Sequence, residues 1–349
     1  MKQERLEPRS LGRLHPLALE AFVTKQVHTP ETSLKHDILG LHHVTATVND
    51  AQADLDFYRD LLGLRLVKKT VNFDNHSVYH FYYGDERGTP GTLWTTFPYK
   101  GWGVAPGRHG RGQITVTSFS VPPGSLDTWE RHIQESDTPT HESTAPDGNR
   151  ALSFADPSGL VIRLVEVKDD ARAPWTGSGV SAERAIRGLH SVTMTLNDPA
   201  PTLALMTSVL GFQVVDETEQ VTRLAVQGDG SGRYVDLVRD SRALPARNGL
   251  GTVHHVAMAI ATGAEQAQLR QELMTLGYAV TDVLDRQYFQ SIYFREPGGV
   301  LLEVATVEPG FTVDEPLAQL GCELKLPPWE ESNRPAIEKS LPLVTRSAD

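Results

Sequence analysis

The sequence predicts an α+β fold of four βαβββ modules in two domains, with each pair of modules closing a curved, mixed sheet around a cup. Three observations predict it. The eleven residues 40–50 return at 188–198 with Gly-Leu-His, Val-Thr and Asn-Asp in the same places. Weaker copies of this alternating strand occur at 113–121 and 252–260. After each copy come a helix-like segment and further strand-like runs, which indicates one supersecondary unit repeated four times.

The four modules can be bounded from turn and helix signals. We expect them at 38–100, 111–168, 186–240 and 250–308, with helices at 53–63, 125–134, 199–211 and 264–277. The first and third helices end in Leu-Gly at Gly63 and Gly211, a common signal for a helix C-terminus. In the second and fourth modules, Asp-Pro-Ser-Gly and Glu-Pro-Gly-Gly form turns into the last strand. Two such units can close a curved sheet whose inward-facing positions line a cup.

The domain boundaries follow from the same repeat. Residues 169–185 are polar and rich in Pro and Gly, as is typical of a linker. They separate a first pair of modules, 38–168, from a second pair, 186–308. We expect 1–37 to be a poorly ordered N-terminal extension and 309–349 to be a C-terminal tail.

Composition excludes several classes of function. The formal net charge is -11, which argues against nucleic-acid binding because that requires a basic face. The single cysteine, Cys322, allows neither an internal disulfide nor a cysteine-based zinc site, and fits a cytoplasmic protein. No stretch approaches the ~18 apolar residues of a membrane helix, so we expect no membrane association.

Two His-His pairs carry the chemistry of the chain. His42-His43 and His254-His255 occupy similar strand contexts, and Glu303 lies in an apolar run. Two histidines and one carboxylate form a metal site that leaves coordination positions open for substrate and oxygen. Because neighbours in a strand point to opposite faces, we expect one histidine of each pair to bind metal and the other to lie on the reverse side.

The repeat also shows where such a site cannot form. Ser191 stands in the third module where the first has His43. In the second module the corresponding positions are about Val116 and Arg163, the latter in place of Glu303. The second and third modules therefore lack the ligand set, so the first and fourth must share a cup if the chain binds metal.

These motifs resemble the vicinal oxygen chelate superfamily of glyoxalases and extradiol dioxygenases. The matching segments are Leu-His-His-Val-Thr-Ala, Val-His-His-Val-Ala, the stretch 285–299 and Leu-Leu-Glu-Val-Ala-Thr. Within the superfamily they look like the hydroquinone ring-cleaving dioxygenases of the dichlorohydroquinone and methylhydroquinone-linked type. The resemblance covers about residues 38–345, whereas the N-terminal extension is unlike most members.

The resemblance implies a ligand set and a reaction. The family's iron ligands fall on His43, His255 and Glu303. Its other active-site residues fall on His42, Thr45, His254, Arg286 and Tyr293. The implied cofactor is Fe(II), with Mn(II) also suited to these ligands. The implied partners are a small hydroquinone- or catechol-type aromatic diol and O2, and self-association into a homo-oligomer is plausible.

Each further residue has a chemical role under this hypothesis. Arg286 is a permanent cation that could hold an oxygen anion of the substrate. Tyr293 could donate a hydrogen bond or relay a proton. His42 or His254 could serve as a base if the cup places either near the substrate.

Ordinary structural roles remain open for three of these residues. Arg286 could simply pair with Asp285 or Asp282 at the surface. Tyr293 could be a plain strand aromatic, and Thr45 could reflect β-propensity alone.

Two other functions compete with the dioxygenase. A glyoxalase-type metal-dependent isomerase or lyase would normally have a fuller ligand set, often with two carboxylates. The analogous last-strand positions in modules three and one hold Asp236 and Thr95, and threonine is a poor ligand. A metal-free module that sequesters an aromatic compound is the third hypothesis, and the intact histidines and Glu303 argue against it.

Overall fold

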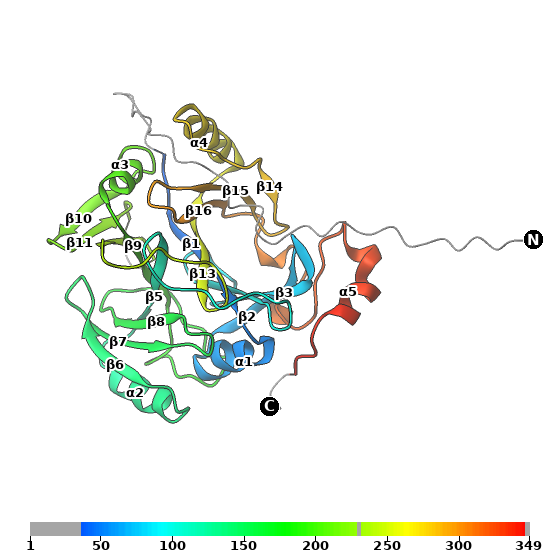
Figure 1. The fold of residues 1–349 in the computed structure, drawn as a ribbon. Helices are drawn as coiled ribbons and strands as arrows, with labels where there is room; N and C mark the ends of the chain where they lie inside the picture. Colours follow the sequence, from blue (N-terminus) through cyan, green and yellow to red (C-terminus); the bar gives the residue numbers. More distant parts are fainter. Residues whose placement is uncertain (1–35, 229–231, 346–349) are drawn as a thin grey trace, which may run out of the picture.

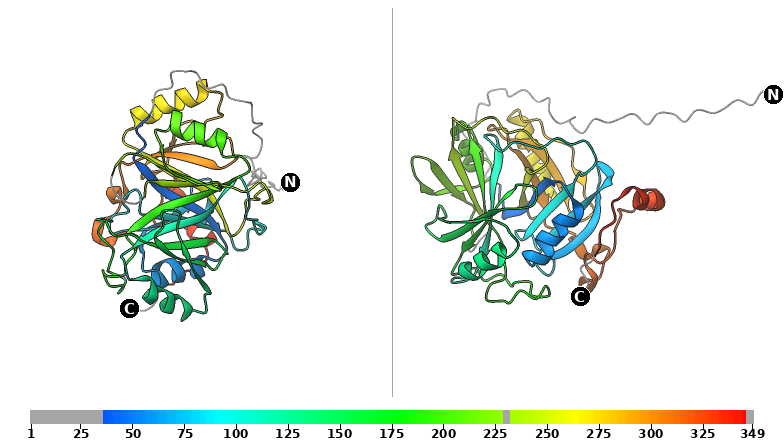
Figure 2. Two further views of the ribbon diagram at one scale, coloured as in Figure 1. Left: turned by 90° about the vertical axis from the view of Figure 1, so that its left-hand side faces the viewer. Right: turned by 60° about the horizontal axis from the view of Figure 1, so that its bottom comes forward.

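The computed structural model describes residues 36–228 and 232–345. The expected N-terminal extension, 1–37, lies outside the described residues apart from its last two positions. The described chain forms two eight-stranded mixed sheets that lie side by side, each strongly curved (Figure 1 and Figure 2). The predicted α+β fold of repeated βαβββ modules is confirmed.

We call the two sheets the first sheet and the second sheet. The first sheet contains, in spatial order, β14 (Leu284–Asp285), β15 (Gln290–Arg295), β16 (Leu301–Thr306), β13 (Thr252–Ile260), β1 (Gly40–Val48), β4 (Leu93–Pro98), β3 (Asn75–Gly84) and β2 (Arg65–Asn72). The second sheet contains β10 (Gln213–Glu217), β11 (Val221–Ala225), β12 (Tyr234–Arg239), β9 (Gly188–Leu196), β5 (Gln113–Val121), β8 (Val161–Glu166), β7 (Arg150–Ala155) and β6 (Thr140–Thr144).

The sheets do not join consecutive modules, so that part of the expected arrangement is wrong. The first sheet joins modules one and four through antiparallel β1 and β13. The second joins modules two and three through β5 and β9. In each module the first strand lies at the edge, and its unpaired backbone groups need a partner strand. The repeat does not reveal which two edges meet, but the requirement that modules one and four share a cup is confirmed.

Consecutive modules meet instead through their helices. These are α1 (Ala51–Leu55), which continues as a π-helical turn to Leu61, α2 (Leu126–Gln134), α3 (Ala200–Ser208) and α4 (Gly263–Thr275). Helices α1 and α2 lie together at one end, and α3 and α4 at the other (Figure 1 and Figure 2). The rings of Phe57 and Phe154 are 6.1 Å apart, and the Thr202 hydroxyl donates to buried Glu296. Within each of the segments 38–168 and 186–308, a helix of one module therefore contacts a strand or turn of the next.

The repeated glycines mark the crossing of the two sheets. Gly40 and Gly188 open β1 and β9 with φ of 143° and 140°. A Cβ atom would lie 2.8 Å from the Gly232 carbonyl oxygen at Gly40, and 3.0 Å from that of Gly91 at Gly188. Only glycine combines this backbone conformation with so close an approach. The conserved spacing of the repeat thus reflects a packing need.

The C-terminal segment after β16 packs against the first sheet. It contains α5 (Arg334–Ser340), which lies beside β3 (Figure 1). Lys68 on β2 is fully buried and donates to Asp314, 2.5 Å away, and to Glu315. This buried ion pairing anchors the segment to the sheet. No helix in the described parts of the chain is long and apolar enough to span a membrane.

A buried carboxyl group beneath the first sheet predicts a pH-dependent stability. Asp54 accepts hydrogen bonds of 2.6 Å from the hydroxyls of Tyr83 and Thr96, and burial raises its pKa from 3.8 to about 8. The folded state holds a proton that the unfolded state releases. The free energy of unfolding should therefore fall as pH rises from about 4 to 8, by at most about 1.4 kcal/mol per pH unit from this group.

Chemical denaturation of the wild type and Asp54→Asn across this pH range measures the effect. We expect the substitution to flatten the slope, whereas Asp56→Asn, at an exposed position two residues further along the chain, should leave it unchanged. An unaltered slope in Asp54→Asn would contradict the assignment.

Candidate metal centre

Three adjacent strands of the first sheet bring the expected ligands together. In register, His43 on β1 lies opposite Ala257 on β13, which lies opposite Glu303 on β16. His255 precedes Ala257 by two residues and therefore shares its face. One ligand atom from each of the three residues lies within 4.8 Å of the others. The histidine Nε2 atoms are 3.3 Å apart, and Glu303 Oε2 is 3.2 Å from that of His43 and 2.8 Å from that of His255.

The three residues fit a divalent metal ion. All are buried, and Glu303 has no exposed surface. Burial alone would raise the pKa of Glu303, but the two imidazoles outweigh it and hold this pKa well below its usual value. Glu303 Oε2 makes no hydrogen bond of ordinary geometry, which is unusual for a buried carboxylate. The two imidazoles of His43 and His255 and the carboxylate of Glu303 together form the donor set that Fe(II) and Mn(II) prefer.

The neighbouring histidines lie on the cup side, so the expectation that strand alternation sends them to the reverse face is wrong. The β1–β13 ladder is shifted at His42 and again at His254. Such bulges re-aim a side chain. As a result, the Nδ1 atoms of His42 and His43 are 2.9 Å apart, and those of His254 and His255 are 2.8 Å apart. The ring of His42 also packs against that of Phe289 in the cup.

These contacts orient the ligand rings. Burial lowers the pKa of His42 and of His254 to about 3, so both imidazoles are neutral. Within each pair, one Nδ1–H donates to the other Nδ1. This bond occupies Nδ1 of the ligand histidine and leaves its Nε2 for the metal, which is the usual way a ligand tautomer is fixed.

Ser291 holds the third ligand and was not anticipated from the sequence. It lies on β15, and its hydroxyl donates to Glu303 Oε1. That bond leaves Oε2 directed at the two histidines. The alternation of β15 next to the Glu303 strand was the only available signal for this partner.

Removing this hydroxyl should weaken metal binding. We expect Ser291→Ala to raise the dissociation constant for Fe(II) or Mn(II) by about 10- to 100-fold, as is typical for a partner of a ligand carboxylate. Anaerobic titration with a competing chelator measures it. Ser291→Thr retains the hydroxyl and should recover most of the affinity; equal affinity in Ser291→Ala and the wild type would contradict the role.

Arg286 and Tyr293 lie beside the ligands. Tyr293 on β15 is directly opposite Glu303 in register, and its ring centroid is 5.5 Å from that of His255. The Arg286 guanidinium carbon lies 5.3 Å from the Tyr293 ring centroid. Arg286 pairs with Asp74 of module one at 3.4 Å, not with Asp285 or Asp282. Its Nε is buried without a hydrogen bond, so part of its donor capacity is directed into the cup.

Thr45 belongs to a chain of polar groups on the other wall of the cup. Its hydroxyl lies 2.7 Å from that of Thr95 on β4, which lies 3.0 Å from Nε2 of His80 on β3. Burial, reinforced by the ligand histidines, holds the pKa of His80 well below its usual value. No local pattern in the sequence marks His80, because the strand pairing that brings β3 beside β4 is not visible in it.

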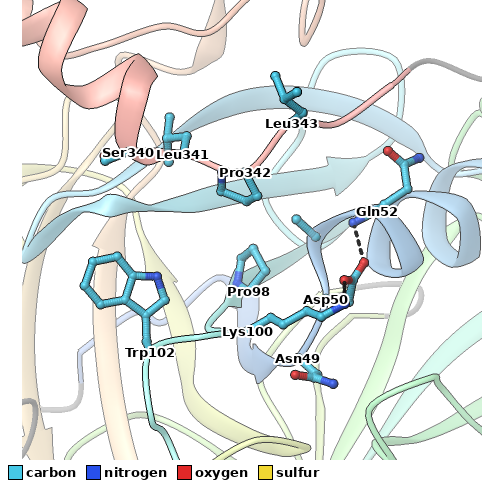
Figure 3. A pocket seen from close by; sticks show the side chains of 11 residues that line it. Asn49, Asp50, Gln52, Pro98, Lys100, Trp102, Ser340, Leu341, Pro342 and Leu343 are labelled. Atoms are coloured by element: carbon cyan, nitrogen blue, oxygen red, sulfur yellow. Dashed lines mark hydrogen bonds and ion pairs between the residues drawn. The ribbon is translucent and has the colours of Figure 1, made fainter.

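A separate surface pocket does not belong to this centre. Figure 3 shows that it lies between the start of α1, the segment 98–102 and residues 340–343. Its charged groups Asp50 and Lys100 pair with each other at 2.7 Å. None of the ligands or their partners lines it.

The chain matches known proteins along most of its length. Residues 40–164 and 188–304 match the Glyoxalase/Bleomycin resistance protein/Dioxygenase superfamily. The "Putative ring-cleaving dioxygenase MhqE" of Bacillus subtilis is 42% identical, with 87% of this chain and 98% of that protein covered. The chlorohydroquinone/hydroquinone 1,2-dioxygenase of Sphingobium indicum is 38% identical, with 85% of this chain and 94% of that protein covered.

Solved structures agree with this assignment. A Bacillus subtilis crystal structure described as a "putative dioxygenase" is 37% identical, with a TM-score of 0.85, and covers 90% of this chain and 100% of that chain. Glyoxalase I from Zea mays, at 13% identity and a TM-score of 0.57 over 76% of this chain and 92% of its own, shares the fold alone. The chain therefore belongs to the Glyoxalase/Bleomycin resistance protein/Dioxygenase superfamily.

Proposed function

We propose that the protein is a metal-dependent dioxygenase that cleaves the ring of a hydroquinone with O2. The observation that carries this proposal is the buried set of His43, His255 and Glu303, which faces the same cup as Arg286 and Tyr293. Relatives at 36–42% identity are named as ring-cleaving dioxygenases. One of them is named for chlorohydroquinone and hydroquinone, which makes a para-diol the preferred substrate class over a catechol.

We assign Fe(II) as the resident metal, with Mn(II) as a substitute that suits the same ligands. When bound, the metal supplies a Lewis acid for the diol oxygen and a redox centre for O2. His43, His255 and Glu303 would hold the metal, and a set of only three protein ligands would let it bind these two small molecules as well.

The chain's own groups bind and orient the diol. The Arg286 guanidinium is a permanent cation that holds the anionic oxygen of a deprotonated diol. Burial raises the pKa of Tyr293 far above neutral pH, so its phenol keeps its proton and donates a hydrogen bond. Thr45, held by Thr95 and His80, offers a hydroxyl on the opposite wall. His42 and His254 act on the ligand rings through Nδ1.

Apolar rings complete the site. Phe289 contacts the rings of both His42 and His43, and Tyr82 packs near Phe289. These buried side chains exclude water from the ligands and strengthen the electrostatic contacts within the cup. The same apolar walls suit a flat aromatic ring.

With a single cysteine and no internal disulfide, we place the enzyme in the cytoplasm.

Oxygen consumption tests the proposal. The protein is stripped of metal, reconstituted with Fe(II) without oxygen, and screened in an oxygen electrode with hydroquinone, chlorohydroquinone, methylhydroquinone and catechol. We expect uptake of one O2 per diol and loss of aromatic absorbance, fastest with a hydroquinone. Protein loaded with redox-inactive Zn(II) is the control. An absence of oxygen uptake with every diol would overturn the function while leaving the metal site intact.

A further inference from the structure

The second sheet forms a cup that corresponds to the metal centre but carries different charges. The register of β5, β8 and β9 matches that of β13, β16 and β1. By this register, Ser191, Val116 and Arg163 stand in the places of His43, His255 and Glu303. A guanidinium therefore replaces the ligand carboxylate. The second cup therefore lacks the three metal-binding side chains, and it carries a positive group where the first cup carries a carboxylate.

Buried polar atoms without hydrogen bonds gather in this second cup. They are the three side-chain nitrogens of Arg223, both carboxylate oxygens of Asp236, and the hydroxyls of Ser118 and Thr193. Arg223 is 3% exposed and Asp236 is fully buried. In the first cup, Glu303 Oε2 is likewise buried without a hydrogen bond, and there the atom belongs to the proposed metal site. Such groups are normally paired in a protein interior.

The orphaned groups lie next to one another. Arg223 is opposite Asp236 across β11 and β12, and Asp236 is opposite Thr193 on β9. The nearest nitrogen of Arg223 is 3.6 Å from Asp236 Oδ1, too far for a hydrogen bond. The ring of Tyr234 covers the guanidinium, 4.4 Å from its carbon. The N–H groups of Arg223 lie in the plane of its guanidinium, and they need a hydrogen-bond acceptor in that plane.

The balance of charge favours an anion. Arg163 and Arg223 supply two positive charges, and the carboxyl groups that face them are Asp147 and Asp236. Asp147 is engaged by His190 at 3.0 Å and by Arg223 at 3.4 Å. Burial raises the pKa of Asp236. This favours its neutral form, and a neutral Asp236 leaves the cup with an excess of positive charge. A planar oxyanion accepts from a guanidinium in the fork geometry that arginine provides.

We propose that the second cup binds a small oxyanion of the carboxylate class through the guanidinium of Arg223, beside Asp236. The hydroxyls of Ser118 and Thr193 and the Arg163 side chain line the same face. This site is separate from the metal centre and does not depend on the dioxygenase reaction. Bound water would also satisfy some of these donors, and anion titration distinguishes bound water from a bound oxyanion.

Calorimetric titration with sodium acetate and with sodium phosphate, at ionic strength held constant with sodium chloride, tests the proposal. The metal-loaded chain and a Glu303→Gln variant are both titrated, because anions can also bind a metal. We expect saturable binding of acetate to both proteins, with a rise in melting temperature. A response to phosphate but not acetate would overturn the carboxylate class, and no binding of either anion would overturn the site in favour of water.

A double variant removes the charges without leaving one unpaired. Arg223→Met with Asp236→Leu replaces the buried pair by apolar side chains of similar size, which proteins often tolerate. We expect it to fold, to keep its oxygen uptake, and to lose at least about tenfold in acetate affinity, as expected for losing a charge-assisted hydrogen bond. If Glu303→Gln binds acetate and this folded double variant binds it equally well, Arg223 is not the site.

Discussion

Replacing His255 by alanine should abolish stoichiometric metal binding and lower oxygen uptake at least ~1000-fold, because two ligands cannot hold the metal that the reaction needs. The expected loss is large because, among the described residues, His43, His255 and Glu303 form the one group of three His, Cys or carboxylate ligand atoms within 4.8 Å of one another. Elemental analysis of purified, reconstituted protein and an oxygen electrode measure both quantities.

The second cup provides a matched control for this substitution. Ser191 stands where the first cup has His43, and it is equally buried. Ser191→Ala should keep full metal content and activity. Glu303→Gln should behave like His255→Ala, because the neutral amide cannot balance the charge of a divalent ion. A His255→Ala protein that retains one metal per chain and full activity would overturn the ligand assignment.

The sequence singled out the three candidate ligands because chemistry and repetition agreed. Two His-His pairs at the same place in their modules, with Glu303 in a buried strand, left few structural explanations. The repeat also excluded modules two and three through Ser191 and Arg163. From this it followed that modules one and four share a cup, which the pairing of β1 with β13 confirms.

What the sequence could not predict depends on strand pairing and its irregularities. Alternation is reliable only in a regular ladder, and the bulges at His42 and His254 place both histidines of each pair in the cup. Likewise, Ser291, His80 and Thr95 become partners of the site only through neighbouring strands. Their residue types are common in strands, so no local pattern marks them. The roles of Arg286 and Tyr293 came from resemblance, and they remain proposals. The position of Tyr293 beside His255, and of Arg286 beside Tyr293, supports them.

Replacing Arg286 by methionine should lower kcat by about 100- to 1000-fold while leaving metal content unchanged, as for loss of a preorganised cation at a developing charge. The Arg286 side chain is 17% exposed and its Nε has no hydrogen-bond partner among the residues that the structure describes, so this donor is available to the substrate. It contacts no ligand directly through a hydrogen bond, which separates its effect from metal loss. Metal analysis, kcat and KM for a hydroquinone, measured on the same preparation, check this expectation.

Two further variants decide whether charge or geometry matters. Arg286→Lys keeps the charge but loses the planar fork, so we expect an intermediate kcat. Asp74→Asn removes the only ion-pair partner that Arg286 has among the described residues. The Asp74 carboxylate lies 3.4 Å from Arg286, and the Asp74 side chain is 77% exposed. Because exposed ion pairs contribute little, Asp74→Asn should change kcat by less than about threefold. If Asp74→Asn is as damaging as Arg286→Met, the arginine serves to join modules one and four. If only Arg286→Met is damaging, its charge acts on the substrate.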